Sequence, residues 1–593
     1  MKRITWLDVV IAISFAIFAL AFQLQRWGGY DPAIFMGSDA GVYTEIAAAE
    51  AYPDLFIGDA LLQRADNYNF YKVAHIFAIR ALGWLTGDYG KGMIFLLGPL
   101  VLTHLLGYYI LGRVLYQNRF WAIILSLTTA VYISPPVSDD VGLLFDPIPG
   151  LAFGALLPYL LAAIIRFQDE TDKWKIIMAC CAGMIYIHPV SAPAWVFGLW
   201  LFYAFSNPDG LLAGQRIKRA VVLGMVAFFL ALPFAVVYIG SHDTAPSDPL
   251  KVAAIRDAME ARIEPAYLHP ISTIGVFFKW LLTDFRYTYF ALLSLTFLLY
   301  DNRYKQKVRT LVKLIFGVVL FSIVFPSIEY LRTVYTGIPY QTEFIRPLKY
   351  VIPVIFVLSV WGLRALHARL ALFGTTASIV SVLIGFLFVA YVHRKNPNVV
   401  DSIYPPIQAW FHGDFLPKKA KKNLLEVEAI RAVRQFTPEK SKLFVTSDRA
   451  LEVRYAALRP VVFAYKDGST FAFSNYSALL KWHEVYKKVG GRFKKTGYSP
   501  AELEQTMIPL ARELDAEYIL VFFGDYFEKL GSNIVSRNNL GIPKIVPITA
   551  SAVSTSLTPV TPLEWNKGSS DVNLRGVSHV WSNGQYGLYR LTG

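Results

Sequence analysis

The sequence contains very little cysteine and little charge. Of its 593 residues only two are cysteines, Cys180 and Cys181, and they are adjacent in an apolar run. Two such residues cannot build a disulfide framework or a thiolate metal site. Charged residues make up 17% of the chain, against about 25% in soluble domains, and hydrophobic residues reach 55%. This balance is typical of a protein with several membrane spans.

The net charge of +14 does not indicate a nucleic-acid-binding protein. The basic residues lie mostly in short loops between apolar runs and in the C-terminal part, which is where a membrane protein carries them. We therefore expect membrane lipids, and no nucleic acid, among the partners.

The N-terminus begins with the basic residues Lys2 and Arg3, and an apolar run then continues to about Phe22. The run is longer than the apolar core of a signal peptide, and no small-residue cleavage site follows it. It predicts a retained first span with a cytoplasmic start. Runs of about 20 apolar residues are needed to cross a bilayer. By this criterion the expected spans, about eleven in all, are 5–24, 92–112, 120–136, 148–165, 175–189, 191–206, 220–240, 282–300, 312–328, 350–366 and 371–392.

Basic residues crowd alternate loops, as the positive-inside rule requires for a cytoplasmic N-terminus. Examples are Arg113 and Arg119 in the first inner loop and the group at 303–309 in the fourth. An odd number of spans then places everything after about Tyr391 on the outer face. This predicts a multi-pass protein of a bacterial cytoplasmic membrane, with a periplasmic or extracytoplasmic C-terminal part.

The first outer loop, about 25–91, is long and contains two stretches with helical apolar spacing, at 42–51 and 70–85. Amphipathic helices of this kind tend to lie in the membrane interface. We expect both helices there.

The composition becomes that of a soluble protein after His393. We divide the chain into a transmembrane domain at 1–395, a linker at 396–423 and a soluble domain at 424–593. Helical patterns and buried strand patterns alternate in the last part, which favours an α/β fold. Helices are expected at 424–434, 479–488 and 500–514, strands at 443–446, 461–463, 518–523, 578–581 and 587–591, and an irregular excursion at 532–573. The expected fold class is a polytopic α-helical membrane protein with a C-terminal α/β domain.

Carboxylates near a membrane are functional candidates because a charge there is costly unless it is solvated or paired. Asp39 is the first candidate, since it follows the first span and begins a helical stretch. It is interpreted as a helix N-cap or as a catalytic base, and the residues alone leave both open. Further outer-face acids that are candidate site residues are Asp59, Asp139, Asp140 and Asp146. Clustered carboxylates favour a divalent cation, whereas single ones are solubilising loop residues.

Basic residues on the outer face run against the positive-inside trend. Arg346 and Lys349 follow Glu343 immediately before a span, and Arg332 lies nearby. Arginine can bind a phosphate in a bidentate manner, but a basic side chain can equally extend to lipid headgroups. His188, in Ile187-His188-Pro189, is a candidate ligand or proton carrier at the outer end of a span, or a capping residue at a helix break.

This order of features resembles the GT-C superfamily of integral-membrane glycosyltransferases. An early span, a long outer loop with an acid near its start, many further spans and an outer soluble domain carry the resemblance. Within that superfamily the chain is similar to a poorly characterised bacterial group, through Tyr52–Asp59, Ile187–Pro189 and the run from Phe436 to Trp482. The resemblance implies a polyprenyl-phosphate or polyprenyl-diphosphate sugar as donor and a glycan, lipid or protein as acceptor. It implies that Asp39 is the catalytic residue and that Arg346 holds the donor phosphate, with Lys349 and Arg332 beside it.

The sequence departs from the best-known pattern at two points. Ala40 follows Asp39 where a second acid is common, which puts a requirement for Mg²⁺ or Mn²⁺ in doubt, and no Trp-Trp-Asp triplet occurs in the tail. A protein N-glycosylation enzyme is therefore not expected. The competing hypotheses are a membrane transporter without chemistry, although no two-fold internal repeat is visible, and a polysaccharide or filament assembly subunit. A common cavity for Asp39, Asp59 and Arg346 would favour the enzyme, and scattered positions would favour the assembly subunit.

Overall fold

A computed structural model describes most of the chain as two compact units. It describes residues 5–27, 38–137, 140–144, 146–241, 243, 246–339, 343–371, 374–394, 424–494, 496–524, 572, 574–583 and 585–592. The first unit is Met1–Pro53, Leu61–Lys421 and Lys466–Glu484, and the second is Asp54–Ala60, Lys422–Tyr465 and Val485–Gly593. The linker expected at 396–423 and, apart from Val572, the excursion expected at 532–573 lie outside the described residues.

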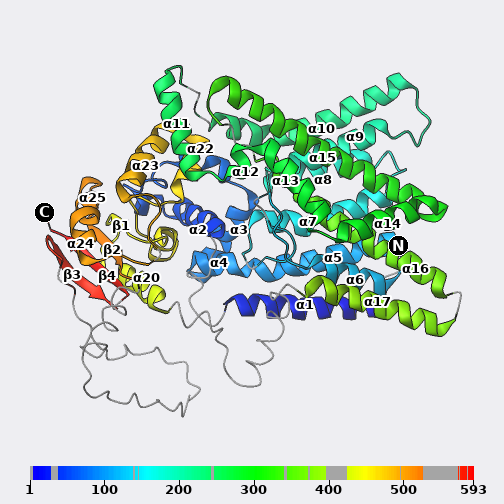
Figure 1. Cartoon of the computed structure of the whole chain (residues 1–593), viewed down its shortest axis with the longest axis horizontal. Helices are drawn as coiled ribbons and strands as arrows, with labels where there is room; N and C mark the ends of the chain where they lie inside the picture. The colour runs from blue at the N-terminus through cyan, green and yellow to red at the C-terminus, as the bar shows by residue number, and fades with distance from the viewer. Residues whose placement is uncertain are drawn as a thin grey trace, which may run out of the picture. The chain divides into compact units, whose positions relative to one another are not determined.

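The named secondary-structure elements in the described part of the first unit are all helices (Figure 1), with one isolated β-bridge between Ile133 and Val141. Its helices up to the expected linker are α1 (Trp6–Trp27), α2 (Ser38–Ala51), α3 (Ala74–Thr86), α4 (Tyr89–Phe95), α5 (Leu97–Tyr116), α6 (Arg119–Thr129), α7 (Pro149–Arg166), α8 (Trp174–Gly183), α9 (Ala192–Phe205), α10 (Ala213–Gly240), α11 (Pro249–Arg262), α12 (Pro265–Leu268), α13 (Pro270–Thr283), α14 (Tyr287–Tyr300), α15 (Asn302–Thr336), α16 (Val351–Leu370) and α17 (Thr375–His393). Short 3-10 helices are η2 (Pro53–Phe56), η3 (Ala65–Asn67), η4 (Asn69–Tyr71), η5 (Met184–Tyr186) and η6 (Arg346–Tyr350). The unit also contains α22 (Asp467–Ser474) and the part of α23 (Tyr476–Val489) up to Glu484.

Six helical stretches of the first unit are long and apolar enough to cross a membrane. They are Trp6–Leu24, Tyr89–Tyr116, Pro149–Arg166, Ala213–Gly240, Asn302–Thr336 and Arg346–Leu370. These coincide with six of the expected spans. The other expected spans fall on apolar helices of 10–17 residues. The described helix lengths therefore support six full-length spans and not eleven. Most of the expected span 282–300 forms α14, and its first two residues end α13. The charged residues Asp284 and Arg286 lie at the break between the two helices.

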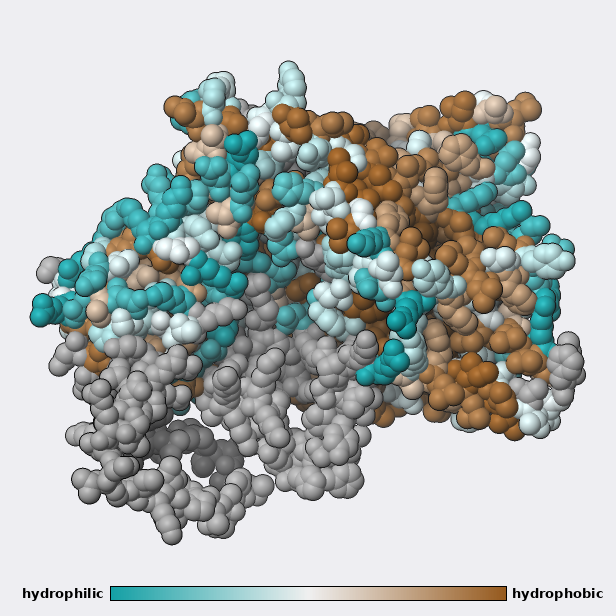
Figure 2. Space-filling model, in the orientation of Figure 1, coloured by the Kyte–Doolittle hydropathy of each residue, from teal (hydrophilic) through white to brown (hydrophobic). Residues whose placement is uncertain are grey.

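The surface of this unit is rich in exposed hydrophobic side chains. Examples on α10 are Phe228 and Phe229, which are 60% and 59% exposed. Hydrophobic residues dominate the visible surface over the long helices (Figure 2). A water-soluble protein rarely exposes apolar patches of this extent, so the surface is that of a membrane-embedded helical protein.

Small residues allow the long helices to approach closely. A Cβ on Gly317 of α15 would meet the Cα of Gly198 of α9 at 2.6 Å. Helices in membranes pack through such small residues because lipid gives no hydrophobic drive for association. The contact fixes α9 against α15, two helices that lead to the site described below.

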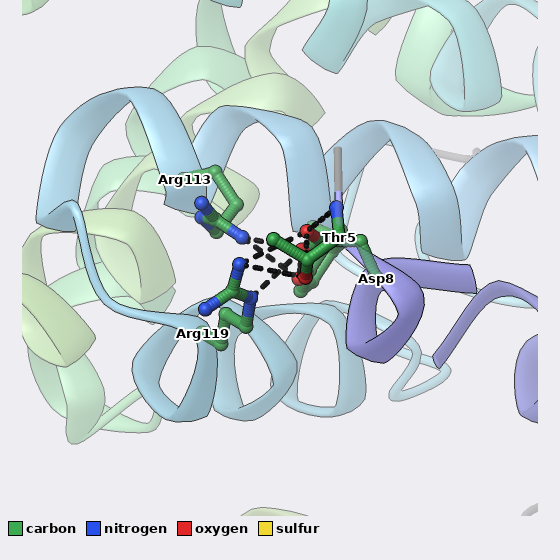
Figure 3. A network of polar contacts seen from close by, with 5 residues as sticks. Thr5, Asp8, Arg113 and Arg119 are labelled. Carbon is green, nitrogen blue, oxygen red and sulfur yellow. Dashed lines mark hydrogen bonds and ion pairs between the residues drawn. The ribbon is translucent and has the colours of Figure 1, made fainter. Parts of the chain in front are cut away.

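The first helix is tied to its neighbours by one carboxylate at its N-terminal end. Oδ1 of Asp8 accepts hydrogen bonds from Tyr109 Oη at 2.6 Å, Arg113 at 2.5 Å and Arg119 Nε at 2.9 Å. Its Oδ2 accepts from the backbone and hydroxyl of Thr5 (Figure 3). Charge-assisted bonds of this kind are the stronger ones, so the network holds α1 against α5 and α6.

The two helices expected in the membrane interface behave differently from each other. Helix α2 is enclosed by the unit, and residues Thr44 to Ala49 are at most 1% exposed. Helix α3 buries Ile76 and Ile79 but exposes Trp84 (76%) and Leu85 (69%). The small side chains Ala47–Ala49 explain the burial of α2, since they let other elements pack directly on it.

The second unit contains a four-stranded sheet and short helices. Its elements are α20 (Leu424–Phe436), β1 (Leu443–Val445), α21 (Ala450–Glu452), η8 (Val453–Ala457), α24 (Pro500–Glu502), η9 (Leu503–Met507), α25 (Ile508–Glu513), β2 (Tyr518–Phe522), β3 (Val577–Ser582) and β4 (Tyr586–Leu591). The strand order is β1-β2-β4-β3, with β1 parallel to β2 and the other pairs antiparallel. Its core includes Val433, Leu443, Leu520 and Leu588. The α/β expectation is confirmed, except that 461–463 forms only an isolated bridge, through Val461 to Leu443.

Two short segments each belong to a different unit from the residues that flank them in the sequence. Asp54–Ala60, from the first expected outer loop, is part of the second unit, and Lys466–Glu484, from the expected soluble domain, is part of the first. In the first unit Ser474 donates a hydrogen bond to the carbonyl of Asn67 at 2.8 Å, and the ring of Phe473 packs against Phe70. The division therefore differs from a single cut near residue 424.

Candidate functional site

A cavity of about 170 Å³ lies within the first unit, lined by charged and aromatic side chains. Its charged or titratable lining residues are Asp39, His188, Arg262, Glu264, Glu343, Arg346 and Lys466. Its aromatic lining residues are Tyr43, Phe70, Tyr71, Tyr238, Tyr267 and Phe473. A concave site that combines aromatic side chains with polar groups is the usual form of a ligand pocket.

Asp39 occupies the first turn of α2, directly after Ser38, where a negative charge is favoured by the helix dipole. Its carboxylate accepts a hydrogen bond from Nζ of Lys466 at 2.5 Å. The charge of Lys466, aided by Arg346 and Arg262, holds the pKa of Asp39 below its usual value, against the opposing effect of burial. Asp39 is therefore ionised at neutral pH.

Arg346 begins η6 and is held by two groups in the cavity wall. Its guanidinium is 2.9 Å from Oε2 of Glu343, and its Nε donates to the hydroxyl of Tyr267 at 2.8 Å. Its charge also lies over the Tyr267 ring, 5.1 Å from the centroid. These contacts fix the plane of the guanidinium at the cavity, as a group that binds an anion in a defined geometry requires.

Two further cations reach the cavity, and the search for site residues in the sequence did not single out either of them. Arg262 ends α11 and donates to the hydroxyl of Ser469 at 3.3 Å, and Lys466 precedes α22. Arg262 could have been identified from the sequence by its positive charge in an expected outer loop. Lys466 gave no such signal, because its position in the cavity depends on the inclusion of Lys466–Glu484 in the first unit.

Two half-buried tyrosines, Tyr43 and Tyr71, line the cavity with Asp39. Burial raises the pKa of Tyr43 and of Tyr71, and the negative charge of Asp39 contributes to both. Their rings meet edge to face with centroids 5.7 Å apart. Both hydroxyls stay protonated at neutral pH and can donate a hydrogen bond.

His188 and Lys349 meet at one glycine of the cavity wall. A Cβ on Gly150 would lie 3.5 Å from Nζ of Lys349 and 3.8 Å from Nε2 of His188. The Nδ1 atom of His188 is 2.8 Å from the hydroxyl of Ser191. His188 and Gly150 line the cavity, whereas Lys349, only 1% exposed, lies behind this glycine.

The structure thus brings Asp39, His188, Glu343 and Arg346 into one cavity, with Lys349 next to it. It does not bring the remaining candidates there. Arg332 is exposed on α15, and Asp140 and Asp146 lie between α6 and α7, outside the cavity lining. Asp139 is outside the described residues.

Asp59 belongs to the second unit and does not line the cavity with Asp39 and Arg346. The common cavity that would favour an enzyme therefore holds two of the three residues. The side chains of Asp59 and Arg454 are both 0% exposed within the second unit, and they form an ion pair of 2.8 Å. The Asp59 carboxylate also accepts from the backbone amide of Val461 at 2.7 Å. A buried carboxylate with this bonding is a structural anchor, which the sequence could not distinguish from a site residue.

A divalent cation at this site stays a prediction. Within the described ranges, no group of three His, Cys, Asp or Glu side chains lies close enough to hold a metal ion. Asp39 is paired with Lys466 and Glu343 with Arg346, so these two carboxylates have cationic partners.

Comparison of the chain with models of known protein families gives no match, and comparison with curated proteins gives none either. The cavity itself therefore carries the functional argument.

Proposed function

We propose that the protein is an integral-membrane glycosyltransferase. It would move a sugar from a polyprenyl-phosphate or polyprenyl-diphosphate donor to an acceptor hydroxyl at the outer face of a bacterial cytoplasmic membrane. One observation carries the proposal. Asp39, Arg262, Arg346 and Lys466 come from four distant parts of the sequence and line one cavity with six aromatic side chains.

The membrane topology that we propose has eleven crossings with the N-terminus inside. The cavity lining supports this topology, because the ends of several helices meet at the cavity. Pro149 and Gly150 at the start of α7 line the cavity, and so do His188–Val190 between α8 and α9 and Tyr238 near the end of α10. All these helix ends share one face of the unit. The half-length helices α13 and α14 would together make one crossing, since 14 residues of helix extend only about 21 Å.

The phosphate of the donor would bind to Arg346, Arg262 and Lys466. Positive groups fixed where negative charge develops on a leaving group stabilise the transition state. The phosphate must compete with Glu343 for Arg346 and with Asp39 for Lys466. This competition has a useful consequence, because a cation drawn toward the phosphate no longer lowers the pKa of Asp39.

Asp39 would act as the general base. It would take the proton of the acceptor hydroxyl as that oxygen bonds to the anomeric carbon and the bond from this carbon to the phosphate oxygen breaks. The lipid phosphate would leave with the electron pair, and a single displacement of this kind inverts the anomeric carbon. A base is most effective when its pKa approaches the working pH. Asp39 paired with Lys466 is a weak base, and it becomes a stronger one once the donor phosphate has engaged Lys466.

The aromatic side chains would hold the sugar. Tyr43, Tyr71 and Tyr267 line the same cavity. Protonated tyrosine hydroxyls can donate to sugar oxygens, and apolar ring faces pack against the C–H face of a pyranose. These groups fix orientation, as the few polar groups of a ligand pocket usually do.

A non-catalytic transporter or assembly subunit that binds a lipid-linked glycan is the alternative function. The cations and aromatics would serve it equally well. Asp39 separates the two, because a binding protein gains nothing from a carboxylate that opposes the charge of its phosphate ligand.

The test is transfer by the full-length protein in nanodiscs, with a panel of polyprenyl-phosphate sugars and release of polyprenyl phosphate as readout. Asp39→Asn should bind donor but lose at least 100-fold in turnover, within the usual range for removal of a general base. Asp66→Asn is the matched control. Asp66 lies in the same expected outer loop, 25–91, but its side chain is 78% exposed. Wild-type turnover in Asp39→Asn would refute the proposed base, and absence of turnover with every donor would favour the binding protein.

A further inference from the structure

A second cavity, of about 380 Å³, lies at the other end of the first unit. It is lined by the segments that follow α7 and α9 and by the beginning of α15. Helix α7 has Gly150 at the candidate site and ends just before Gln168, which lines this second cavity. The 18 residues of α7 extend about 27 Å, close to the thickness of a bilayer core. The two cavities therefore belong to opposite membrane faces, and the basic loops predict the cytoplasmic face for the second.

Three cations of α15 line the second cavity. Lys305, Arg309 and Lys313 are spaced i, i+4 and i+8, so they follow one face of the helix. None of the three side chains has a hydrogen bond or ion pair with any described residue. The one carboxylate of the lining, Asp169, accepts hydrogen bonds from the amide of Gln306 at 2.9 and 3.1 Å. The lining thus carries three cations against one carboxylate, and its net charge is positive.

The same helix face becomes apolar immediately after the cations. Val312 and Phe316 lie i+3 and i+7 from Arg309 and are 38% and 63% exposed. Phe205, which ends α9 and lines the cavity, is 70% exposed. A cationic cavity beside exposed apolar side chains of the same helix matches the chemistry of an amphiphile, with an anionic head and a hydrocarbon chain.

We propose that this cavity is a binding site for an anionic phospholipid of the cytoplasmic leaflet. The phosphate contacts Lys305, Arg309 and Lys313, and one acyl chain lies along Val312 and Phe316. Basic pockets between membrane helices on the cytoplasmic side bind such headgroups. A soluble phosphorylated compound would use the cations alone and would leave Val312, Phe316 and Phe205 without a purpose.

The test uses the purified full-length protein in a neutral detergent, with thermal stability as readout. Phosphatidylglycerol, phosphatidylcholine and glycerol 3-phosphate are titrated separately. Wild type should be stabilised by phosphatidylglycerol and by neither of the others. The phosphatidylglycerol concentration that gives half of the maximal stabilisation should be roughly 30-fold higher for Arg309→Gln/Lys313→Gln. Each basic residue contributes about 1 kcal/mol of binding energy, or about fivefold in affinity. Both residues are exposed, so the variant should fold, and Arg309→Gln alone should need about fivefold more.

The control is Lys175→Gln/Lys218→Gln, which removes the same charge from exposed positions at the starts of α8 and α10, outside the cavity. It should change the half-effect concentration by less than about twofold. Equal losses in the two double variants would show diffuse surface attraction and overturn the proposal. Stabilisation by glycerol 3-phosphate that disappears in Arg309→Gln/Lys313→Gln would assign the cavity to a soluble ligand instead, and unchanged affinity in that variant would also refute the site.

Discussion

Replacement of Asp59 by alanine should destabilise the second unit severely. Both partners of the Asp59–Arg454 ion pair are 0% exposed and 2.8 Å apart. Removal of one partner of a buried pair leaves an uncompensated charge and typically costs about 3–5 kcal/mol. The variant also leaves the Val461 amide without the carboxylate that accepts from it at 2.7 Å. The unfolded population of the unit should therefore rise on the order of 10² to 10³-fold, at about 1.4 kcal/mol per decade.

Limited proteolysis of the full-length protein measures this change, with a C-terminal epitope tag to report on the second unit. When reclosing is faster than cleavage, the cleavage rate follows the population of the open form. Asp54→Ala is the matched control, since Asp54 belongs to the same segment and is exposed. Surface changes of this kind usually stay within about 0.5 kcal/mol.

The double variant Asp59→Ala/Arg454→Met removes both charges and should recover most of the lost protection. Asp59→Asn keeps an oxygen acceptor for the Val461 amide and separates the effect of that hydrogen bond from the effect of the charge. Cleavage of Asp59→Ala at the rate of Asp54→Ala would refute the account of Asp59 as a buried anchor.

Two further predictions concern pH. Lys466→Met removes the largest cause of the lowered pKa of Asp39, so this pKa should rise. The acidic side of the curve of transfer rate against pH should then move to higher pH. An unchanged curve would exclude Asp39 as the titrating base. Burial lowers the pKa of His75, on α3, to about 4. Between about pH 6.5, its pKa in the unfolded chain, and pH 4, only the unfolded state binds the proton. The free energy of unfolding therefore decreases as the pH is lowered through this range. The loss at pH 5 should be about 2 kcal/mol, visible as a lower melting temperature than at pH 7.5, and it should be absent from His75→Gln; an equal loss in both proteins would show that other groups cause it.

Much of the fold was predictable from local pattern. Apolar runs located the six long spans because a bilayer demands about 20 such residues in sequence. Strands β1 and β2 and the β3–β4 hairpin were also found, since short buried runs between turn residues are a local signal. The charged residues Lys279, Asp284 and Arg286 mark 265–300 as an ambiguous region in the sequence, and the helix breaks there, between α13 and α14.

The site was predictable only in part, for a different reason. Asp39 and Arg346 carried a local signal, an acid after a span and a base against the positive-inside trend. Lys466 reaches the cavity through the inclusion of Lys466–Glu484 in the first unit. Asp59 carries a similar local signal to Asp39, and only the burial of its partner Arg454 assigns it to the core. Long-range packing of this kind leaves no periodic trace in the sequence.

Binding of polyprenyl phosphate to the full-length protein in nanodiscs tests the central claim most directly. Arg346→Gln should weaken binding at least tenfold, because a hydrogen bond to a charged group contributes about 1.5–3 kcal/mol. Arg332→Gln, which removes an exposed arginine outside the cavity lining, should bind as wild type does. Equal affinity of wild type and Arg346→Gln, or an equal loss in both variants, would contradict the assignment of this cavity to a lipid-linked phosphate.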